Sequence, residues 1–212
     1  MGNAVSRCVI LGAGPVEDAE ALRPLLHPGD LVLAADGGLR LAQRLGVRPA
    51  AVIADFDSAA EGGSAGGTVV RLPVRKDVTD TAAAADYGWA RGCREYLLLG
   101  GTGGRLDHEY ANLLLLVQLV RRGGRAVLAD GRNRIEAVCR SPVTPEPLPG
   151  WSLSLFAFGG AVESLSITGA EYRLEDDRLL PEDPLCVSNT ILGEDCVIRF
   201  SSGTLLLFRS KD

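Results

Sequence analysis

The sequence lacks the features that mark several specialised classes of protein. It has no excess of positive charge, because 22 lysines and arginines stand against 27 aspartates and glutamates and give a formal net charge of -5. This balance argues against nonspecific nucleic-acid binding, and the lack of a basic block argues against docking on a membrane surface. The five cysteines are odd in number and have no CxxC spacing, which favours reduced thiols over a disulfide framework or a zinc site. They are Cys8, Cys93, Cys139, Cys186 and Cys196.

Long apolar runs are missing as well. The first apolar segment, Cys8–Leu11, has the length of a strand and is too short for the core of a signal peptide. Leu113–Val117 falls far below the ~20 residues that a membrane-spanning helix needs. Hydrophobic residues make up 46% and charged residues 23% of the 212-residue chain, as in ordinary globular proteins. We therefore expect a cytoplasmic protein that binds neither nucleic acid nor membrane.

Before residue 141, strand-length apolar runs alternate with helical segments. Asp80–Arg91 is rich in alanine and stops at Gly92, and Thr79 or a neighbour can cap its start. Asp107–Arg122 contains repeated leucines and ends at Gly123, which predicts a largely buried helix. Such alternation predicts an α/β fold with a mainly parallel sheet and helices on both faces. The expected strands are Cys8–Leu11, Leu31–Ala35, Ala51–Ala54, Thr68–Leu72, Glu95–Leu99 and Ala126–Ala129.

A proline-rich segment predicts a domain boundary at residues 141–150. Four of these ten residues are proline, which cannot continue a helix or a central strand. We therefore expect an α/β domain over residues 1–140, a linker over 141–150 and a second domain over 151–212. Short alternating runs in the second domain predict a small antiparallel β-sandwich or barrel. These runs are Trp151–Phe158, Ala161–Thr168, Cys196–Phe200 and Thr204–Arg209.

Acidic residues follow two of the expected strands. Asp55 and Asp57 come directly after Ala51–Ala54, and Asp36, followed by Gly37, ends the preceding strand in the same way. A helix cap and a solvated turn residue are the simpler interpretation of one such acidic pair. Two acidic loops at the carboxyl edge of a parallel sheet instead favour a ligand site. Because the carboxylates repel each other, a cation or a proton is needed between them. A cation here favours Mg²⁺ and a phosphate ligand.

A glycine-rich turn, Gly100–Gly104, stands between an expected strand and a long helix. Backbone N–H groups cradle phosphate in this arrangement, although no Walker A sequence is present. Arg105 can contact phosphate with two hydrogen bonds, whereas Asp107 is explained equally well as a first-turn acid. His108 and Asn112 lie four residues apart and so share one helix face, where a buried structural histidine is the default interpretation.

Three other segments carry less information by themselves. Lys76 can neutralise phosphate, and Asp80 can bind metal or orient a hydroxyl, but Asp80 can equally complement the helix dipole. Gly12–Pro15 lacks the third glycine of a dinucleotide fingerprint and predicts a tight strand-to-helix turn. Val187–Asn189 is polar and turn-prone.

Taken in order, these motifs resemble the thiamine pyrophosphokinase (thiamine diphosphokinase) family over nearly the whole chain. Two departures are visible. Ala54 stands where the family commonly has glycine, and a tryptophan that covers thiamine in some eukaryotic members is missing, with Leu207 or Phe208 in that region. The motifs that carry the resemblance are Ala35–Gly38, Ala54–Ser58, Lys76–Thr81, Gly100–Asn112 and Val187–Asn189.

The resemblance implies Mg²⁺-dependent transfer of pyrophosphate from ATP to the hydroxyl of thiamine, giving thiamine diphosphate and AMP. It implies that Asp55, Asp57 and Asp80 bind magnesium, and that Asp80 or Asp107 orients or deprotonates the hydroxyl. It also implies a homodimer whose active site lies at the subunit interface. The residues expected to bind nucleotide or phosphate are Asp36, Gly37, Lys76, Thr102, Arg105 and His108. The residues expected to bind thiamine are Asp80, Asp107, Asn112, Ser188 and Asn189.

Other functions fit parts of the same pattern. One is a pyrophosphokinase for another small alcohol, such as a hydroxymethyl-pterin. Another is a noncatalytic sensor of thiamine or nucleotide, although a sensor does not need the Asp55/Asp57 pair. A Rossmann-type oxidoreductase is disfavoured because the glycine fingerprint is incomplete.

Overall fold

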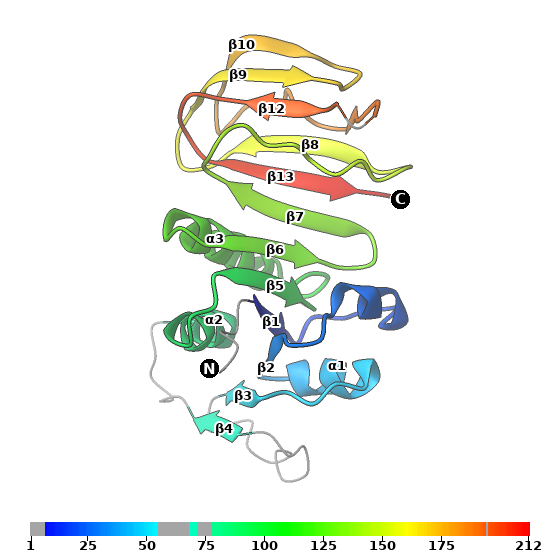
Figure 1. Ribbon diagram of the computed structural model, residues 1–212, viewed down its shortest axis with the longest axis vertical. Helices are drawn as coiled ribbons and strands as arrows, with labels where there is room; N and C mark the ends of the chain where they lie inside the picture. The colour runs from blue at the N-terminus through cyan, green and yellow to red at the C-terminus, as the bar shows by residue number, and fades with distance from the viewer. Residues whose placement is uncertain (1–6, 55–67, 72–77, 194) are drawn as a thin grey trace. The chain divides into compact units, whose positions relative to one another are not determined.

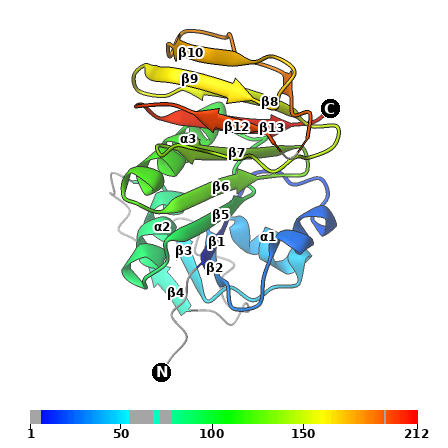
Figure 2. The same cartoon turned by 45° about the horizontal axis from the view of Figure 1, so that its top comes forward.

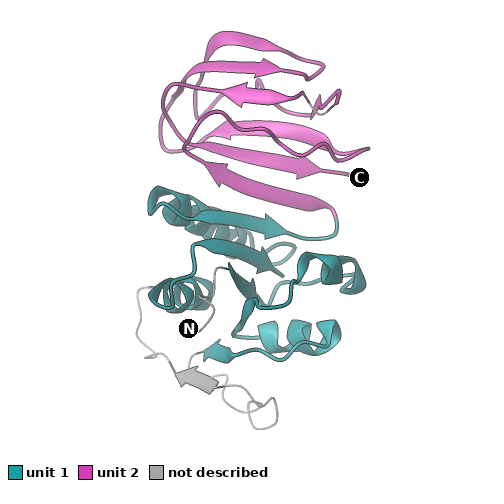
Figure 3. Ribbon diagram, viewed as in Figure 1, with its two compact units in different colours: residues 1–131 teal, residues 132–212 magenta. Residues whose placement is uncertain are grey.

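The computed structural model describes residues 7–54, 68–71, 78–193 and 195–212. The chain divides into two compact units, Met1–Gly131 and Arg132–Asp212 (Figure 3). The described helices include none that is long and apolar enough to cross a membrane.

The first unit contains a parallel sheet with the strand order β6-β5-β1-β2-β3-β4 (Figure 1). In-register parallel pairing joins each neighbouring pair, so that Leu11 of β1 lies beside Ala34 of β2 and Leu99 of β5. The expected parallel strands are confirmed, with ends that differ by at most one residue. The strands are β1 Arg7–Leu11, β2 Leu31–Ala35, β3 Ala51–Ala54, β4 Thr68–Arg71, β5 Glu95–Leu99 and β6 Arg125–Ala129.

Helices cover both faces of this sheet, as Figures 1 and 2 show. On one face, η1 (Glu20–Leu25) and α1 (Gly38–Leu45) contribute buried residues to a cluster with β1 and β5. On the other face, α2 (Asp80–Ala90) packs on β1, β2 and β3, and α3 (Leu106–Arg121) packs on β6. The close approach of α2 to β1 depends on Gly88, because a Cβ there would lie 2.9 Å from Sγ of Cys8.

The two long helices begin close to where the sequence predicts. Thr79 caps α2, since its hydroxyl accepts a hydrogen bond from the Ala82 N–H at 3.2 Å. Helix α3 begins at Leu106, so Asp107 lies in its first turn and Arg105 occupies the cap position without a side-chain cap hydrogen bond. An acidic first-turn residue interacts favourably with the positive end of the helix dipole.

The strand order reverses between β1 and β5. Strands β2, β3 and β4 follow one another on one side of β1, while β5 and β6 lie on the other side. In open α/β sheets, ligands bind outside the carboxyl ends of the strands at such a reversal. We therefore expect a ligand site at the loops that follow β1 and β5.

The second unit is a sandwich of two antiparallel sheets, which confirms the expected fold class. Their strand orders are β11-β8-β13-β7 and β10-β9-β12. Alternate residues of β8 and β13, such as Leu155 and Leu207, pack against inward residues of the second sheet, such as Leu165, Ile167 and Ile198. Each such fully buried side chain contributes roughly 1.5–3 kcal/mol. The strands are β7 Asn133–Val138, β8 Ser152–Ala157, β9 Val162–Thr168, β10 Leu174–Leu179, β11 Asn189–Thr190, β12 Val197–Arg199 and β13 Leu205–Ser210.

The division between the units lies earlier than the proline-rich segment at 141–150, where we expected it. Strand β7 belongs to the second unit because it pairs along its whole length with β13, from Asn133 beside Ser210 to Val138 beside Leu205. The proline-rich segment is thus a connection inside the second unit. Its Val143 exchanges backbone hydrogen bonds with Ile198 at 2.8 and 2.9 Å.

Candidate active site

The carboxyl edge of the parallel sheet brings the loops after β1 and β2 together. Gly38 follows β2, and a Cβ on it would lie 1.9 Å from the Leu11 carbonyl oxygen at the end of β1. Asp36 is exposed, has a positive φ of 49° and donates its N–H to the Ile53 carbonyl of β3 at 2.8 Å. Aspartate tolerates this left-handed conformation better than most residues. The loop thus holds the Asp36 carboxylate at the edge of the sheet.

The loops after β1 and β5 also touch. The Gly12 N–H donates to the Leu99 carbonyl at 2.7 Å, and the Gly14 N–H donates to the Gly100 carbonyl at 2.8 Å. A Cβ on Gly12 would lie 2.5 Å from the Gly100 carbonyl oxygen. Both glycines of the Gly12–Pro15 turn are therefore required for the close packing of the two loops, which agrees with the tight turn expected there.

Three side chains hold the glycine-rich turn Gly100–Gly104 in place. Asn112 is buried and donates from Nδ2 to the Gly101 carbonyl at 2.9 Å. The Thr102 hydroxyl donates to Oδ2 of Asp130 at 2.7 Å, and Oε1 of Glu109 accepts from the Gly104 N–H at 2.9 Å. The turn is thus fixed before any ligand binds, which lowers the entropic cost of ordering it around phosphate.

Glu109 and Asp130 were not among the expected site residues. Their sequence positions carried a usable signal, because Asp130 directly follows β6 at the same edge and Glu109 lies in the first turn of α3. Thr102 and Asn112 were expected to bind ligand directly. The structure shows that they hydrogen-bond within the protein and support the turn.

Arg105 and Asp107 form an exposed ion pair at the end of the turn. The guanidinium donates from Nε to Oδ1 at 3.1 Å and from Nη2 to Oδ2 at 2.5 Å. The hydrogen bond from Arg105 lowers the pKa of the Asp107 carboxyl below its ordinary value, and the same hydrogen bond raises the pKa of Arg105. The side chains are 73% and 63% exposed, so water screens the pair and an incoming phosphate can replace the carboxylate at low cost.

The first turns of α2 and α3 carry the other acids and the histidine. Asp80 is half-buried and is the first residue of α2, which crosses from β4 back to β5 in a parallel sheet and so begins at the carboxyl edge. His108 is exposed in the first turn of α3, and its N–H donates to Oδ1 of Asp107 at 3.0 Å. The structure therefore brings Asp36, Asp80 and the Arg105–Asp107 pair to one edge of one sheet.

Asp55, Asp57 and Lys76 lie outside the described residues. Strand β3 ends at Ala54, beside the loop that carries Asp36. Within the described part of the chain, no group of three or more histidine, cysteine or acidic side chains is arranged to hold a metal ion. The described residues alone thus do not complete the expected magnesium site.

In the second unit, the expected thiamine residues lie at β11. Ser188 is exposed, with a positive φ of 58°, and its N–H donates to Oγ of Ser154 at 3.0 Å. Asn189 is buried, and its side-chain amide hydrogen-bonds to backbone groups of Tyr172 and Thr190. Of the two residues near the missing tryptophan, Leu207 is buried in the sandwich core and cannot cover a ligand. Phe208 is half-buried and meets Phe156 edge to face, with 5.4 Å between the ring centroids.

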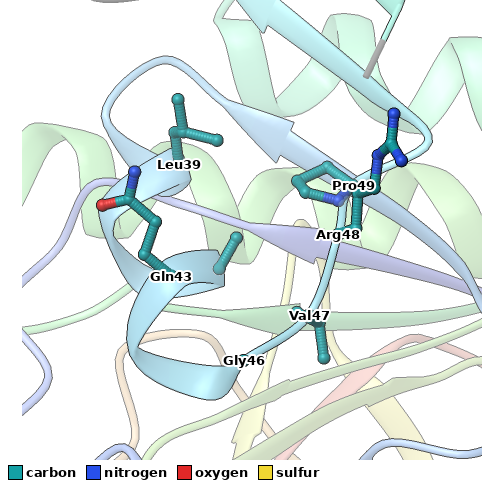
Figure 4. Close-up of a pocket in the computed structure, with 7 residues that line it drawn as sticks. Leu39, Gln43, Gly46, Val47, Arg48 and Pro49 are labelled. Carbon is teal, nitrogen blue, oxygen red and sulfur yellow. The ribbon is translucent and has the colours of Figure 1, made fainter. Parts of the chain in front are cut away.

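A hollow of about 300 Å³ lies on the first unit (Figure 4). It is formed by α1 and by the segment that leads from α1 into β3, at the amino end of that strand. None of the expected site residues that the structure describes lines it. Its lining residues are Leu39, Ala42, Gln43, Gly46, Val47, Arg48 and Pro49.

Comparison with known proteins agrees with the division of the chain into two units. The family model described as thiamin pyrophosphokinase, catalytic domain, matches residues 22–128, and the model described as thiamin pyrophosphokinase, vitamin B1 binding domain, matches residues 143–205. The thiamine pyrophosphokinase of Bacillus subtilis (strain 168) is 26% identical over 209 residues, which cover 96% of this chain and 98% of that protein.

Solved structures give the same result. A crystal structure of thiamine pyrophosphokinase from Bacillus subtilis superposes with a TM-score of 0.88 at 25% identity, covering 98% of this chain and 100% of the other. A crystal structure of thiamin pyrophosphokinase from Geobacillus thermodenitrificans superposes with a TM-score of 0.85 at 27% identity, covering 97% of this chain and 98% of the other. The first family model alone covers half of the chain. The chain therefore belongs to the thiamine pyrophosphokinase family and is an enzyme of thiamine diphosphate synthesis.

Proposed function

We propose that the enzyme transfers the β,γ-pyrophosphoryl group of ATP to the hydroxyl of thiamine in a Mg²⁺-dependent reaction that releases AMP. The observation that carries this proposal is the convergence of Asp36, Asp80, the preorganised glycine turn and the Arg105–Asp107 pair on one sheet edge. Phosphoryl transfer is catalysed mainly by positioning and by neutralising charge, and these groups are suited to both tasks.

The acids at this edge fit a hard divalent cation. We assign Asp55, Asp57 and Asp80 to Mg²⁺, because the ion prefers oxygen ligands and usually binds through one or two carboxylates together with substrate phosphates. When bound, the ion neutralises charge on the transferred group. We assign Asp36 and the adjacent Gly37, which follow the end of β2, to the nucleotide side of the site.

The glycine turn and its neighbours form the phosphate side of the site. Arg105 can exchange its carboxylate partner for a phosphate with the same two-pronged geometry. Lys76 and His108 add charge or hydrogen-bond donors, while Thr102 contributes by holding the turn through Asp130. An Arg105→Ala variant should raise KM for ATP at least about tenfold. Arg105→Lys keeps the charge but loses the forked guanidinium, so its KM for ATP should lie between those of the wild type and of Arg105→Ala. Equal KM for ATP in all three proteins would refute this assignment.

Asp107 is better suited to orienting the thiamine hydroxyl than to deprotonating it. The hydrogen bond from Arg105 lowers the pKa of its carboxyl in the free enzyme. After phosphate has replaced it at Arg105, an exposed carboxylate is still a weak base for an alcohol, so its main contribution is to position the hydroxyl. We therefore propose that Asp80 or Asp107 accepts the hydroxyl hydrogen bond and aligns the oxygen with the β-phosphorus. Asp107→Asn keeps an acceptor oxygen, so it should retain more turnover than Asp107→Ala.

An apolar stripe on α3 supports a homodimer with the active site at the subunit interface. Leu106, Tyr110 and Leu114 recur every four residues on one face of the helix and are 80%, 56% and 36% exposed. Large exposed apolar patches mark interaction surfaces. In the proposed dimer the stripe is covered by the partner copy, and Ser188 of each copy acts in the partner's site.

Sedimentation of a Leu114→Lys variant tests the dimer. We expect a monomer with little turnover, because a lysine in the buried centre of an interface has no paired charge. Gln43→Lys, at an exposed position of α1 on the other face of the sheet, is the matched control and should remain a dimer. A Leu114→Lys protein that sediments as the wild type does would exclude the stripe from the interface.

A turnover assay tests the function itself. Purified protein with ATP, Mg²⁺ and thiamine should form thiamine diphosphate and AMP in equal amounts, and chelation of the metal should stop the reaction. Release of ADP in place of AMP would contradict pyrophosphoryl transfer. A panel of small alcohols at fixed ATP, including a hydroxymethyl-pterin, tests the choice of acceptor.

A further inference from the structure

Asn189 has a side chain whose hydrogen bonds are directed into the protein. It is 5% exposed, and its Oδ1 accepts from the N–H groups of Tyr172 at 3.0 Å and Thr190 at 2.8 Å. Its Nδ2 donates to the Tyr172 carbonyl at 2.7 Å. The amide thus binds both backbone groups of one residue, as a neighbouring strand would. Three of the four hydrogen bonds that this amide can make are thus directed to backbone groups, which leaves only one N–H for a direct contact with a substrate.

Further backbone contacts fix the segment that ends at Tyr172. The Glu171 N–H donates to the Thr190 carbonyl at 2.9 Å, and Ala170 forms an antiparallel bridge with Ile191. The Leu192 N–H closes the arrangement with a 3.0 Å hydrogen bond to the Gly169 carbonyl. The backbone of Tyr172 therefore has little freedom.

Whereas the backbone of Tyr172 is held by hydrogen bonds, its side chain is open to solvent, since the residue is 65% exposed. Other apolar side chains around β11 are also exposed: Leu185 by 56%, Val187 by 45% and Leu192 by 63%. Both β11 and Tyr172 lie within the part of the chain that matches the vitamin B1 binding model. An aromatic side chain on a fixed backbone offers contact area at a small entropic cost on binding.

Negative charge lies close to the same strand. Burial, followed by the nearby carboxylates of Asp177 and Asp183, raises the pKa of the Cys186 thiol to about 11. Cys186 is three residues before Asn189, and its carbonyl accepts the Leu155 N–H at 2.8 Å in the neighbouring strand β8. These acids make the surroundings of β11 favourable for a cation such as the thiazolium ring of thiamine.

We propose, on the basis of the proposed function, that Tyr172 is the aromatic face on which the cationic thiazolium ring of thiamine stacks. Asn189 is then a positioning residue that acts through Tyr172 and does not itself contact thiamine. Ser188, exposed beside it, remains in direct reach of the ligand. An aromatic face attracts a cation more strongly than it attracts a neutral ring of the same shape.

Calorimetric titration with two ligands tests the role of the ring. The ligands are thiamine and a neutral analogue in which carbon replaces the positively charged thiazolium nitrogen. For Tyr172→Leu we expect Kd for thiamine to rise about 3- to 30-fold while Kd for the neutral analogue changes little. Tyr172→Phe keeps the ring face and should bind both ligands as the wild type does. Leu192→Ala is the control that removes exposed apolar surface without a ring, and it should affect both ligands equally.

A double-mutant cycle tests whether Asn189 acts through Tyr172. Asn189→Ala should raise Kd for thiamine about as much as Tyr172→Leu, and the double variant should bind no more weakly than either single variant. Direct contact of both side chains with thiamine would instead make the two losses multiply. Asn189→Asp retains the acceptor for the two N–H groups, so it provides the same test if the alanine variant folds poorly.

The outcomes separate this assignment from the function on which it rests. Equal losses of affinity for thiamine and for the neutral analogue in Tyr172→Leu would overturn the stacking role, as would an unchanged Kd for thiamine. If Tyr172→Leu lost thiamine affinity and also sedimented as a monomer, Tyr172 would be an interface residue, and the stacking role would be overturned too. If the wild-type protein neither bound nor converted thiamine, the proposed function would fail and this assignment with it.

Discussion

Replacing Asn112 with alanine separates two roles that this residue can have in the site. The resemblance to the family implies contact with thiamine, whereas the structure shows a buried amide that donates to the Gly101 carbonyl of the glycine-rich turn. If the second role is the important one, the substitution should impair the phosphate side of the site and leave the thiamine side almost unchanged.

The structure sets the expected size of the effect on stability. Asn112 is 8% exposed, and its Nδ2 lies 2.9 Å from the Gly101 oxygen. An acceptor that loses its partner in a partly buried turn costs about 1–3 kcal/mol. For a chain of this size each kcal/mol shifts Tm by about 2–4 °C, so a central loss of about 2 kcal/mol lowers Tm by about 4–8 °C.

Steady-state kinetics distinguish the two roles directly. We expect KM for ATP to rise about tenfold in Asn112→Ala, which corresponds to about 1.4 kcal/mol of lost binding, while KM for thiamine stays within about twofold of the wild-type value. Gln118→Ala removes an exposed amide from the same helix and should change neither KM nor Tm. An increase in KM for thiamine with an unchanged KM for ATP would refute the structural role and restore direct contact.

Two further substitutions test the close packing at Gly38 and the ion pair between Arg7, at the start of β1, and Asp30. Gly38→Ala places a Cβ 1.9 Å from the Leu11 carbonyl oxygen, so we expect little soluble folded protein, whereas Gly131→Ala has open space around its Cβ and should melt as the wild type does. Similar Tm values for the two variants would contradict the close approach. Burial alone raises the pKa of Asp30, but hydrogen bonds, chiefly from Arg7, outweigh burial and leave its pKa below the ordinary value. Its contribution to stability is therefore complete above the unfolded pKa of about 3.9 and is lost as pH falls through the lower folded pKa. The difference in urea stability between wild type and Asp30→Asn should be large at neutral pH and shrink below about pH 4, and a difference independent of pH would show that the carboxylate charge is not involved.

Most of the fold could be predicted because parallel strands buried on both faces appear in the sequence as short apolar runs between turns. The strand Leu31–Ala35 is such a run, and its observed ends are those expected. Strand β10 was missed for the opposite reason. Four of its six residues are charged, and register shifts after Leu174 and Asp177 interrupt the alternation that marks a half-buried strand. Strand β7 was missed because it does not form an apolar run, since the charged residues Arg134 and Glu136 stand on either side of Ile135.

The location of the site was predictable, but the tasks of its residues were not. Once the strand ends are known, the loops after β2 and β5 must lie at one edge, and this much follows from the order of motifs. A polar residue in such a loop has the same sequence signal whether its side chain points to a ligand or to the backbone. Thr102, Asn112 and Asn189 all proved to hydrogen-bond within the protein, and only the tertiary packing shows this.

Burial divides the polar residues of the site into two groups with different physical tasks. Asn112 and Asn189 are buried, and an unmade hydrogen bond at such a position costs about 1–3 kcal/mol, so they keep one set of partners and hold two segments rigid. Asp36, Arg105, Asp107 and Ser188 are exposed, and water screens the ion pair between Arg105 and Asp107, so breaking this pair costs little. A triphosphate with several negative charges can displace Asp107 from Arg105 for that small cost. The displaced carboxylate is then available to accept a hydrogen bond from the substrate hydroxyl. Under the proposed function, binding of the nucleotide and orientation of the alcohol are coupled through this one ion pair, on a turn that is already in place.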